Sequence, residues 1–559
     1  MSSLAEQPRE TTRPESVVEI DVLVVGSGAA GFTAALTSAA AGLETLLVEK
    51  ASYYGGTTTL SGGAIWVPNA PALARAGQWT EPEDLVTYLR AITGGEVPDE
   101  LLRAAVTAGP QMMTFLEGLS PHLTFDWCAG YPDYYPSAPH GSEIGRSVEA
   151  TPFDRRELGS LGAQLREPAL RTPRGMWMRA VDLYDLVSLR RAWRGKQMMG
   201  RMLGRAATAA VTGRRIVTRG EALIGRLRLA LRDSGTPLWL NSPVSELLIE
   251  DGVVVGAVVK QAAREVTVRT RRGVVLTTGG FDHNPEMRQE YQPFLLDHVG
   301  AGAPELTGDG IRLGQTAGAD LALMDEAWWM PAIPWGGGRL GMLLVERQIA
   351  AQFTVDHQGR RFTNEAAPYN DFVHALIRAG CTTAKPAWLI IDSRAWKRNL
   401  FSTHLPLPRL PGAPVPTGAG LPPEWLESGA VRQADTWADL AHQIGVDEGV
   451  LSRTAATFNA MAAQGRDEEF HRGENAYDNY YGNARLKNPN LAPVEAPPYY
   501  AFAVVPSDLG TKGGLVIDTH ARVLTPDGDP IPGLYAAGNT SASVMGRSYP
   551  GPGDRKSVV

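Results

Sequence analysis

Three glycines near the beginning of the chain have the spacing of a phosphate-binding turn. Gly26, Gly28 and Gly31 form a GxGxxG motif directly after the apolar, β-branched run at 18–25. The first glycine permits a tight turn, the second lets backbone N–H groups approach a pyrophosphate, and the third lets the following helix pack against the strand. Glu49 follows about 20 residues later, where a carboxylate accepts hydrogen bonds from ribose hydroxyls and repels a 2′-phosphate. The pattern predicts dinucleotide binding and disfavours NADP.

Further glycine clusters distinguish between NAD and FAD. Lys50 is followed by Gly55-Gly56-Thr57 and by Ser61-Gly62-Gly63. Gly279-Gly280 and Gly538-Asn539 each end a later apolar run. Glycines let the backbone run close against a planar ring, which simple NAD dehydrogenases do not need, so we expect FAD. The candidate cofactor-binding residues are Gly26, Gly28, Ala29, Ala30, Gly31, Glu49, Lys50, Gly55, Gly56, Thr57, Ser61, Gly62, Gly63, Gly279, Gly280, Gly538 and Asn539.

The segments around these motifs predict an α/β fold. An apolar run before the glycine turn, an Ala-rich stretch after it and a second apolar run at 43–49 form one βαβ unit. Strand-like runs at 247–260 and 266–278, and a return to strands from residue 499, indicate one domain built from both chain ends. We expect a Rossmann-like FAD-binding domain interrupted by an inserted α+β catalytic, or capping, domain. The expected division is a flexible tail at 1–17, the FAD-binding domain at 18–296 and 495–559, and the capping domain at 297–494.

The composition excludes several classes of protein. With 61 glycines and 40 prolines among 559 residues, the chain stays below the roughly 25% that marks low complexity. A net charge of −7 argues against general nucleic-acid binding. Cys128 and Cys381 form no CxxC pair and the histidines lack metal-ligand spacing, so we expect no metal site. We find neither a secretory signal nor a run of about 18 apolar residues, and we expect a cytoplasmic protein.

Longer motifs carry a resemblance to a known family. The glycine turns and the segment from Gly533 to Gly538 resemble the fumarate reductase/succinate dehydrogenase flavoprotein superfamily. Within it, four segments closely resemble the 3-ketosteroid Δ1-dehydrogenases, and the likeness runs over about residues 20–553. These segments are Tyr131 to Tyr135, Arg361 to Tyr369, Asp508 to Gly514, and Met545 to Gly553. The resemblance implies FAD as the cofactor and a 3-ketosteroid as the substrate.

The absence of histidine at two positions bears on the substrate and on how the flavin is attached. Dicarboxylate reductases of the superfamily place a histidine before the late Gly-Gly pair, whereas residues Asp508 to Gly514 contain none. A succinate-type substrate is therefore not expected. Covalent attachment of the flavin would use a histidine near Gly55, and residues 51–65 also contain none. We expect FAD to be bound non-covalently.

The resemblance assigns four residues to a 1,2-dehydrogenation. This reaction removes a proton from C2 and a hydride from C1, and the C2 proton is acidic because the C3 carbonyl can become an enolate. By resemblance, Tyr549 O–H and Gly553 N–H hold the C3 oxygen. Tyr369 takes the C2 proton, and flavin N5 takes the C1 hydride. Tyr134 hydrogen-bonds Tyr369 and helps its proton leave, although the neighbouring Tyr135 is an open alternative.

Other interpretations stay open beside this one. The protein could be another flavin-dependent ketosteroid desaturase, such as a Δ4-dehydrogenase, against which the Tyr-Pro-Gly-Pro-Gly turn argues. It could also be a truncated, inactive fragment with weak FAD binding. Family members continue after Gly553 into a helix that faces the flavin, but here residues 554–559 lack apolar periodicity, so we expect a truncated C-terminus. The segment Asp325 to Trp329 either borders the substrate pocket or lies in the core.

Residues 189–232 form the most basic stretch of the chain. They contain 12 Lys and Arg and a single acid, Glu221. One interpretation is a solvated, partly helical surface. The other is a patch that contacts a membrane surface or a partner, because methionines and a leucine at 198–203 lie among the arginines. Docking at the inner membrane surface would shorten the delivery of a sterol, and an external acceptor, which the sequence does not identify, would take the electrons.

Overall fold

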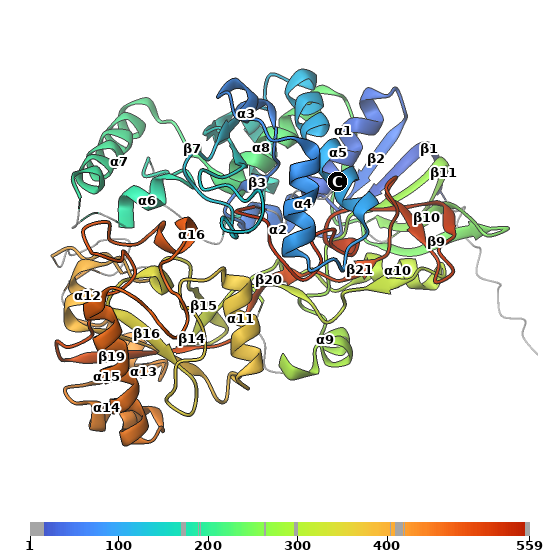
Figure 1. Cartoon of the computed structure of the whole chain (residues 1–559). Coiled ribbons are helices and arrows are strands. Elements are labelled where there is room, and N and C mark those ends of the chain that lie inside the picture. Colours follow the sequence, from blue (N-terminus) through green and yellow to red (C-terminus); the bar gives the residue numbers. More distant parts are fainter. Residues whose placement is uncertain are drawn as a thin grey trace, which may run out of the picture.

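Two bodies, each built around its own β-sheet, make up the structure (Figure 1). The computed structural model describes residues 16–168, 175–187, 189, 192–261, 264–295, 300–402, 404–408, 417–418 and 420–553. The larger body contains the N-terminal glycine turn and most of the early helices. The other body contains α11 (Tyr369–Arg378), α14 (Trp437–Ile444) and α15 (Glu448–Gln464).

The main sheet takes its strands from both ends of the chain and has eight of them within the described residues. β1 (Ser16–Val25) pairs in parallel with β2 (Thr45–Val48) and β11 (Arg264–Leu276), and β11 pairs in parallel with β23 (Pro530–Ala536). The other strands are β8 (Leu238–Trp239), β9 (Val244–Glu250), β10 (Val253–Gln261) and β22 (Arg522–Leu524). β1, α1 (Ala29–Ala40) and β2 confirm the predicted βαβ unit and the α/β class. β1 begins at Ser16, within the segment 1–17 that was expected to be a flexible tail, and residues 1–15 lie outside the described part.

The second sheet has the strand order β16, β17, β19, β18, with antiparallel pairing throughout. Its strands are β16 (Gln352–Val355), β17 (Ala387–Asp392), β18 (Val431–Ala434) and β19 (Tyr499–Val504). Every residue of β17 and β19 is buried, so this pair forms the centre of the second core. The expected boundary at residue 495 therefore came too early. The sequence predicts that β19 is a strand, but it does not show which strands β19 pairs with.

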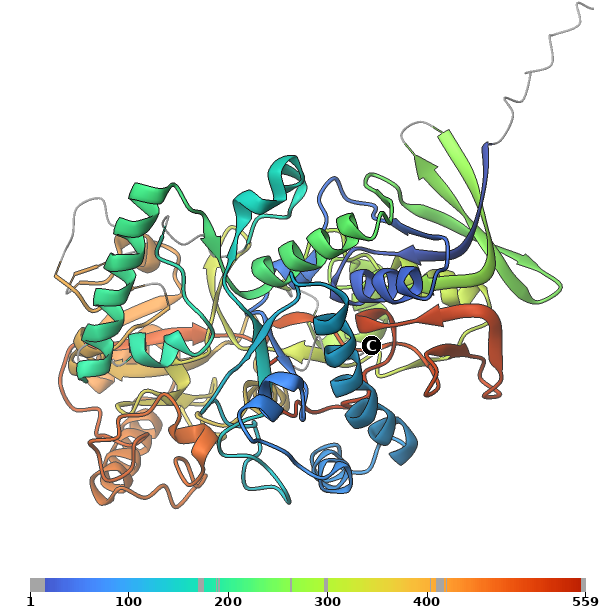
Figure 2. The same cartoon turned by 90° about the horizontal axis from the view of Figure 1, so that it is seen from above.

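Helices and a small three-stranded sheet complete the larger body. α1 packs on α8 (Arg219–Asp233), and α4 (Pro82–Ile92) packs on α5 (Asp99–Leu119). A three-stranded sheet consists of β3 (Ala64–Trp66), β4 (Phe125–Trp127) and β5 (Ser147–Ala150). α6 (Asp182–Val187) and α7 (Trp193–Thr212) pack on each other and lie at the edge of the molecule (Figure 2).

Candidate active site

The glycine turn brings β1, α1 and the end of β11 together too closely for a side chain. Gly26 has a φ of 104°, and a Cβ on it would lie 2.4 Å from the carbonyl oxygen of Thr277. A Cβ on Gly31 would lie 1.8 Å from the carbonyl oxygen of Gly26. Gly28, the N-cap residue of α1, would meet only Thr58 Oγ1 at 3.7 Å. The N-terminal end of α1 therefore has room for a phosphate beside it.

Glu49 stands at the end of β2, beside the glycine turn. Its carboxylate accepts hydrogen bonds from the backbone N–H and the hydroxyl of Ser27, at 3.0 and 2.6 Å, and from Ala51 N–H at 2.9 Å. These bonds hold the carboxylate where the ribose of a dinucleotide would lie. Lys50 Nζ pairs with Asp309 Oδ2 at 2.7 Å, which ties the end of β2 to α10 (Asp309–Thr316).

A cleft with an empty volume of about 1050 Å³ opens at this turn. The predicted residues that line it are Gly26, Gly28, Ala29, Ala30, Glu49, Lys50, Gly56, Thr57, Gly279, Gly538 and Asn539. Sequence reasoning missed several other lining residues, which lie outside any motif: Arg166, Ser242, Thr278, Glu305 and Asp309. A glycine turn, a helix N-terminus and a ribose-binding carboxylate on one cleft fit the adenosine diphosphate half of FAD.

The remaining predicted cofactor residues lie outside the lining of this cleft: Gly31, Gly55, Ser61, Gly62, Gly63 and Gly280. A Cβ on Gly63 would lie 2.2 Å from Arg219 Cα, and one on Gly280 would lie 1.8 Å from Thr511 Oγ1. In the structure these two glycines allow neighbouring segments to approach each other. A contact between this group of residues and the cofactor stays a prediction.

Three of the predicted catalytic residues meet in a buried tyrosine cluster. The hydroxyl oxygens of Tyr134 and Tyr369 lie 2.7 Å apart. The ring centroid of Tyr549 lies 5.1 Å from that of Tyr369 and 6.1 Å from that of Tyr134. Tyr134 comes from the loop between β4 and β5, Tyr369 is the first residue of α11, and Tyr549 follows β23 near the end of the described chain. The fold thus brings three distant segments to one place.

A buried ion cluster holds the loop that leads to Tyr369. Glu365 forms ion pairs with Arg361 at 2.9 Å and with Arg472 at 3.2 Å. Burial alone would raise the pKa of Glu365, but the two guanidinium groups hold it below its usual value. Arg347 donates hydrogen bonds to the carbonyl oxygen of Glu365 at 2.8 Å and to that of Ala367 at 2.7 Å. Arginines therefore hold both the side chain of Glu365 and the backbone carbonyl groups of Glu365 and Ala367, just before Tyr369.

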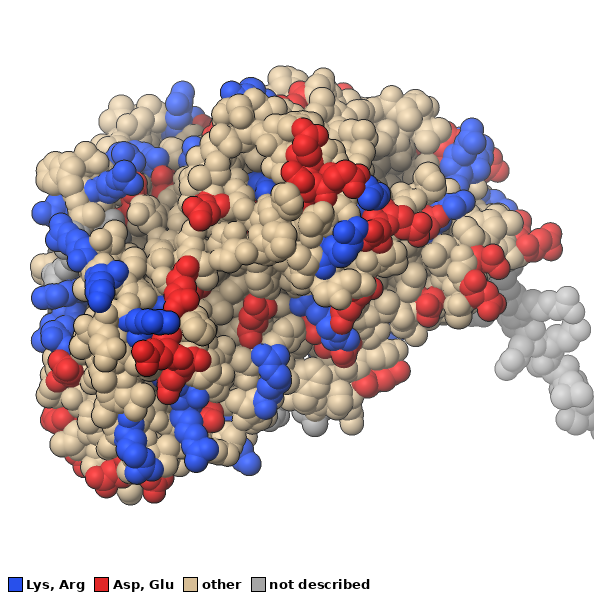
Figure 3. All heavy atoms as spheres, viewed as in Figure 1, with Lys and Arg blue, Asp and Glu red and all other residues tan. Residues whose placement is uncertain are grey.

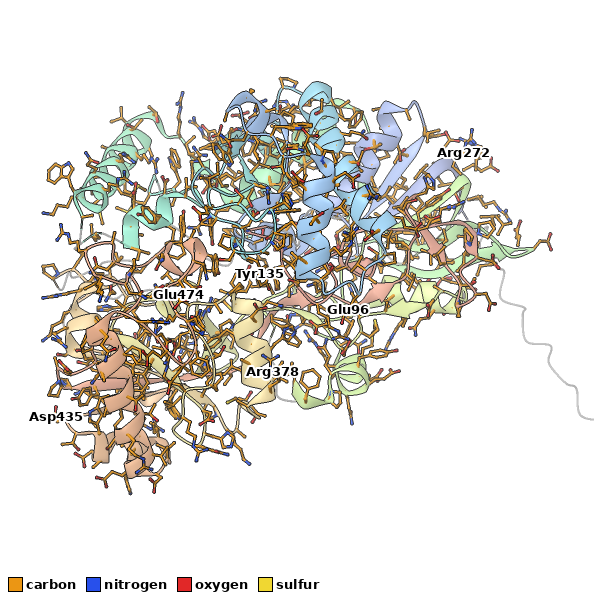
Figure 4. All side chains as sticks on the ribbon, viewed as in Figure 1. Glu96, Tyr135, Arg272, Arg378, Asp435 and Glu474 are labelled. Carbon is orange, nitrogen blue, oxygen red and sulfur yellow. The ribbon has the colours of Figure 1, made fainter. Side chains whose placement is uncertain are left out.

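Tyr135 has a different partner from its neighbour Tyr134. Its hydroxyl donates to Asp371 Oδ1 at 2.8 Å, and Figure 4 shows Tyr135 where the two bodies meet. Burial, together with the nearby Asp371 carboxylate, raises the pKa of Tyr135 well above its usual value. Of the two tyrosines left open by the sequence, Tyr134 is hydrogen-bonded to Tyr369 and Tyr135 is hydrogen-bonded to Asp371.

The proline-rich turn after Tyr549 packs against the larger body. Tyr134 N–H donates to the carbonyl oxygen of Pro550 at 3.2 Å, which links two parts of the tyrosine cluster through the backbone. Gly553 has a φ of 96°, and a Cβ on it would lie 2.2 Å from the carbonyl carbon of Ala64 in β3. Only glycine fits this position, so the backbone of Gly553 lies directly against the edge of the cluster, to which Ala64 belongs.

Trp328 joins the tyrosine cluster to the cofactor cleft. Its Nε1 donates to Asn539 Oδ1 at 3.0 Å, and Asn539 lines the cleft. Its ring lies edge-on to that of Tyr549, with centroids 5.0 Å apart. The hydroxyl of Tyr549 donates to the carbonyl oxygen of Trp329 at 3.3 Å. For the segment 325–329 both pocket and core were open. Trp328 belongs to the tyrosine cluster, whereas the side chain of Trp329 packs in the core of the second sheet.

Three further tyrosines, to which the sequence assigned no role in the site, lie in the cluster or pack against it. The ring centroid of Tyr477 lies 4.9 Å from that of Tyr134, and Tyr131 stacks on Tyr480 at 4.5 Å. Burial raises the pKa of Tyr131 to about 12 and raises that of Tyr477 as well. These phenols stay neutral at physiological pH and form an aromatic wall. Tyr477 and Tyr480 lie outside any recognised motif, so the sequence offered no signal that would place them at the site.

The structure also bears on metal binding, on the cysteines and on membrane-spanning helices. Across the described residues, no group of three or more His, Cys, Asp or Glu side chains could hold a metal ion. Cys128 and Cys381 are buried and unbridged, and burial raises the pKa of both thiols, that of Cys381 to about 11. In the part of the chain that the structure describes, no helix has the length and apolar character needed to cross a bilayer.

The fold and the cleft define a flavoprotein, and comparison with known proteins agrees. A family model described as an FAD binding domain matches residues 21–555. The chain belongs to this FAD-binding family, within which it is similar to the 3-oxosteroid 1-dehydrogenases. FAD as the expected cofactor is thereby confirmed.

Individual relatives show how far the similarity extends. The 3-oxosteroid 1-dehydrogenase of Mycobacterium tuberculosis (strain ATCC 25618 / H37Rv) is 43% identical over 552 residues, which cover 96% of each chain. The 4-oxocyclohexanecarboxylate 2-dehydrogenase of Sinomonas cyclohexanicum is 33% identical, over 99% of this chain and 92% of that protein. The crystal structure of the 3-ketosteroid Δ1-dehydrogenase of Sterolibacterium denitrificans in complex with 1,4-androstadiene-3,17-dione matches with a TM-score of 0.85 and 36% identity, over 96% of this chain and 98% of that one.

These matches decide two expectations from the sequence. The resemblance to the 3-ketosteroid Δ1-dehydrogenases is confirmed. The expected truncation of the C-terminus is not borne out by these matches. Residues 554–559, on which that expectation depended, lie outside the described residues.

Proposed function

We propose that this protein is an FAD-dependent oxidoreductase that introduces a C1–C2 double bond into 3-ketosteroids. The observation that carries the proposal is the hydrogen-bonded pair of Tyr134 and Tyr369, 2.7 Å apart beside Tyr549. Trp328 and Asn539 connect this pair to the cofactor cleft. The larger body then is the FAD-binding domain, and the body with the second sheet is the catalytic domain that caps it.

Each residue of the cluster has a defined task in this reaction. The hydroxyl of Tyr549 turns from the carbonyl oxygen of Trp329 to the C3 oxygen of the steroid, where Gly553 N–H also donates. The two donors stabilise the negative charge that develops on this oxygen. Tyr369 takes the C2 proton, and Tyr134 passes it on through their shared hydrogen bond. When bound, FAD supplies the acceptor for the hydride that leaves C1.

Phenols suit this site better than carboxylates do. A phenol has an ordinary pKa of about 10, so Tyr369 is a weak base near neutral pH unless the ketone is polarised and Tyr134 assists. A carboxylate would cost several kcal/mol to bury among apolar groups. The cluster includes Met330 and has Met342 and Leu344 packed against it, so the surroundings suit a sterol.

An anaerobic visible spectrum of the FAD-loaded protein tests the proposal. Addition of androst-4-ene-3,17-dione should bleach the flavin band and yield the 1,4-diene. With 5α-androstane-3,17-dione, a 1-ene product supports the proposal, whereas a 4-ene product supports a Δ4-dehydrogenase. 4-Oxocyclohexanecarboxylate tests whether a small cyclic ketone is the better substrate. A flavin band that persists with all three ketones would contradict the proposal. Acid precipitation should release the FAD, since we propose that it is held non-covalently.

We also propose that α7 brings the protein to the cytoplasmic surface of a membrane. Trp193, Leu203 and Val211 on this helix are 70%, 55% and 89% exposed. Met198 and Met202, which the sequence pattern grouped with Leu203, instead pack inward. Lys and Arg side chains gather over this side of the molecule (Figure 3). An apolar and basic helix surface suits anionic lipid headgroups. Residues 190 and 191 of the basic stretch lie outside the described residues.

Sedimentation with vesicles that contain phosphatidylglycerol tests the membrane proposal. The wild type should sediment with the vesicles at low salt, and less of it should do so as salt screens the basic residues. Trp193→Ala should weaken binding. Trp79→Ala is the matched control, because Trp79 is 63% exposed but lies outside α7. Equal sedimentation of both variants and the wild type would contradict a role of α7.

A further inference from the structure

Lys512 is a buried cation that the reaction described above does not use. Its side chain is fully buried, and its Nζ donates a hydrogen bond to the carbonyl oxygen of Ser548. Nζ also lies over two aromatic rings, 4.9 Å from the centroid of Tyr549 and 4.5 Å from that of Trp328. The ammonium group therefore sits against the ring of the residue that holds the substrate carbonyl.

The backbone places Lys512 firmly beside the cluster. β20 (Asp508–Thr511) pairs with β13 (Ala327–Trp329), and Lys512 N–H continues this pairing by donating to the carbonyl oxygen of Glu326 at 3.0 Å. On the other side, Ser543 N–H donates to the carbonyl oxygen of Lys512 at 3.2 Å. Both backbone groups of Lys512 are thus hydrogen-bonded, and its side chain starts from a fixed position next to Trp328.

The contacts of Nζ stabilise a positive charge on the lysine, whereas burial by itself disfavours that charge. A carbonyl oxygen accepts a hydrogen bond from an ammonium group, and the face of an aromatic ring carries the negative part of a quadrupole, which attracts a cation. Both attractions are stronger where water is excluded. The charge, in turn, acts on Tyr549, because a cation beside a phenol favours the ionised form of that phenol and makes its hydroxyl a stronger donor.

We propose that Lys512 is a positioning residue of the dehydrogenation: through the ring of Tyr549 it strengthens the hydrogen bond to the substrate's C3 oxygen and stabilises the negative charge that develops there. This inference rests on the proposed function, in which Tyr549 binds that oxygen. In this proposal the charge of Lys512 is in place before the reaction begins. Such preorganised charge stabilises an enolate more than it stabilises the neutral ketone.

The aromatic steroid equilenin tests this inference, because its ionised 3-hydroxyl group resembles the charged C3 oxygen. FAD-loaded wild type, Lys512→Gln and Lys512→Arg are compared. Glutamine keeps a donor toward Ser548 but lacks the charge, and arginine keeps the charge. Fluorescence excitation of bound equilenin, recorded against pH, reports its ionisation. We expect K512Q to raise the apparent pKa of bound equilenin by about one unit, a tenfold loss of the ionised form, and K512R to remain near the wild type.

Binding of the neutral ketone androst-4-ene-3,17-dione is the control, and it should stay near the wild-type affinity in K512Q. Unchanged equilenin ionisation in K512Q overturns the role of Lys512 and leaves the proposed function intact. An equal loss of equilenin and ketone binding also overturns it, since Lys512 would then only support the shape of the pocket. Failure of the wild type to bind any steroid overturns the proposed function, and this inference with it.

Discussion

The hydroxyl oxygens of Tyr134 and Tyr369 lie 2.7 Å apart, although the two residues are 235 positions apart in the chain. Tyr134 belongs to the larger body, and Tyr369 opens α11 in the other body. A proton can pass between the two phenols only while the bodies hold this distance. The chemistry of the site therefore depends on how the two sheets and their helices are packed against each other.

Replacement of Tyr369 or Tyr549 should stop the reaction without removing the cofactor. Neither residue lines the cofactor cleft, so Tyr369→Phe and Tyr549→Phe should both bind FAD. The first lacks the proton acceptor and the second lacks a donor to the C3 oxygen. We expect each to slow flavin reduction at least about a hundredfold in anaerobic stopped-flow measurements. A wild-type rate in either variant would refute the role of that tyrosine.

Tyr134 and Tyr135 form a matched pair for testing proton transfer. Tyr134→Phe removes the hydrogen bond to Tyr369, whereas Tyr135→Phe removes the one to Asp371. We expect Y134F to slow flavin reduction by about 10²-fold, the range of general acid–base effects, with the larger loss at low pH where Tyr369 is hardest to deprotonate. Y135F should stay much closer to the wild type. The opposite order of effects would mean that Tyr135 is the proton partner.

Two glycine variants of the turn separate a structural role from a role in cofactor binding. Gly31→Ala would place a Cβ 1.8 Å from the carbonyl oxygen of Gly26, so it should destabilise the protein even without FAD. Gly28→Ala meets only Thr58 Oγ1 at 3.7 Å, so the apoprotein should tolerate it while the added methyl group blocks the pyrophosphate. Thermal unfolding of the apoproteins and FAD titration separate these effects. Wild-type FAD affinity in G28A would show that the phosphates bind elsewhere.

The ion cluster before Tyr369 should make stability depend on pH. Arg361 and Arg472 hold the pKa of buried Glu365 below its usual value, so its stabilisation is present above about pH 4.3 and is lost as the pH falls through the lowered value. Glu365→Gln should lower the free energy of unfolding by about 3–5 kcal/mol at pH 7. The difference from the wild type should shrink below about pH 4. Denaturant titrations of the wild type and the variant at pH 7 and below about pH 4 measure this difference. A difference that is the same at both pH values would contradict a stabilising role of ionised Glu365.

The cofactor could be predicted from the sequence because its signals are local. Gly26, Gly28 and Glu49 lie within one βαβ unit, and each acts through the conformation of its own segment: a tight turn, a helix start and the end of a strand. Such features depend on neighbouring residues, which the sequence displays directly. The residues that complete the cleft, such as Arg166 and Asp309, come from segments without this pattern and were found only in the structure.

Strand pairing was less accessible to prediction than the strands themselves. β19 has the composition of a buried strand, and the sequence indicates no more than that. Its hydrogen bonds go to β17 and β18, so it belongs to the second sheet and not to the main one. Either sheet could accept an apolar strand, and the choice depends on the packing of the whole chain. The boundary expected at residue 495 was misplaced for this reason.

The sequence by itself determined the α/β class, the dinucleotide turn and, through its motifs, the set of tyrosines available for catalysis. Only the tertiary structure decided that Tyr134 meets Tyr369 while Tyr135 bonds to Asp371, and that Lys512 lies against Tyr549. Adjacent side chains point in different directions, and nothing in their own segment decides which one faces a partner in a distant segment. That choice follows from the burial of apolar surface between two bodies, which acts between residues far apart in the chain.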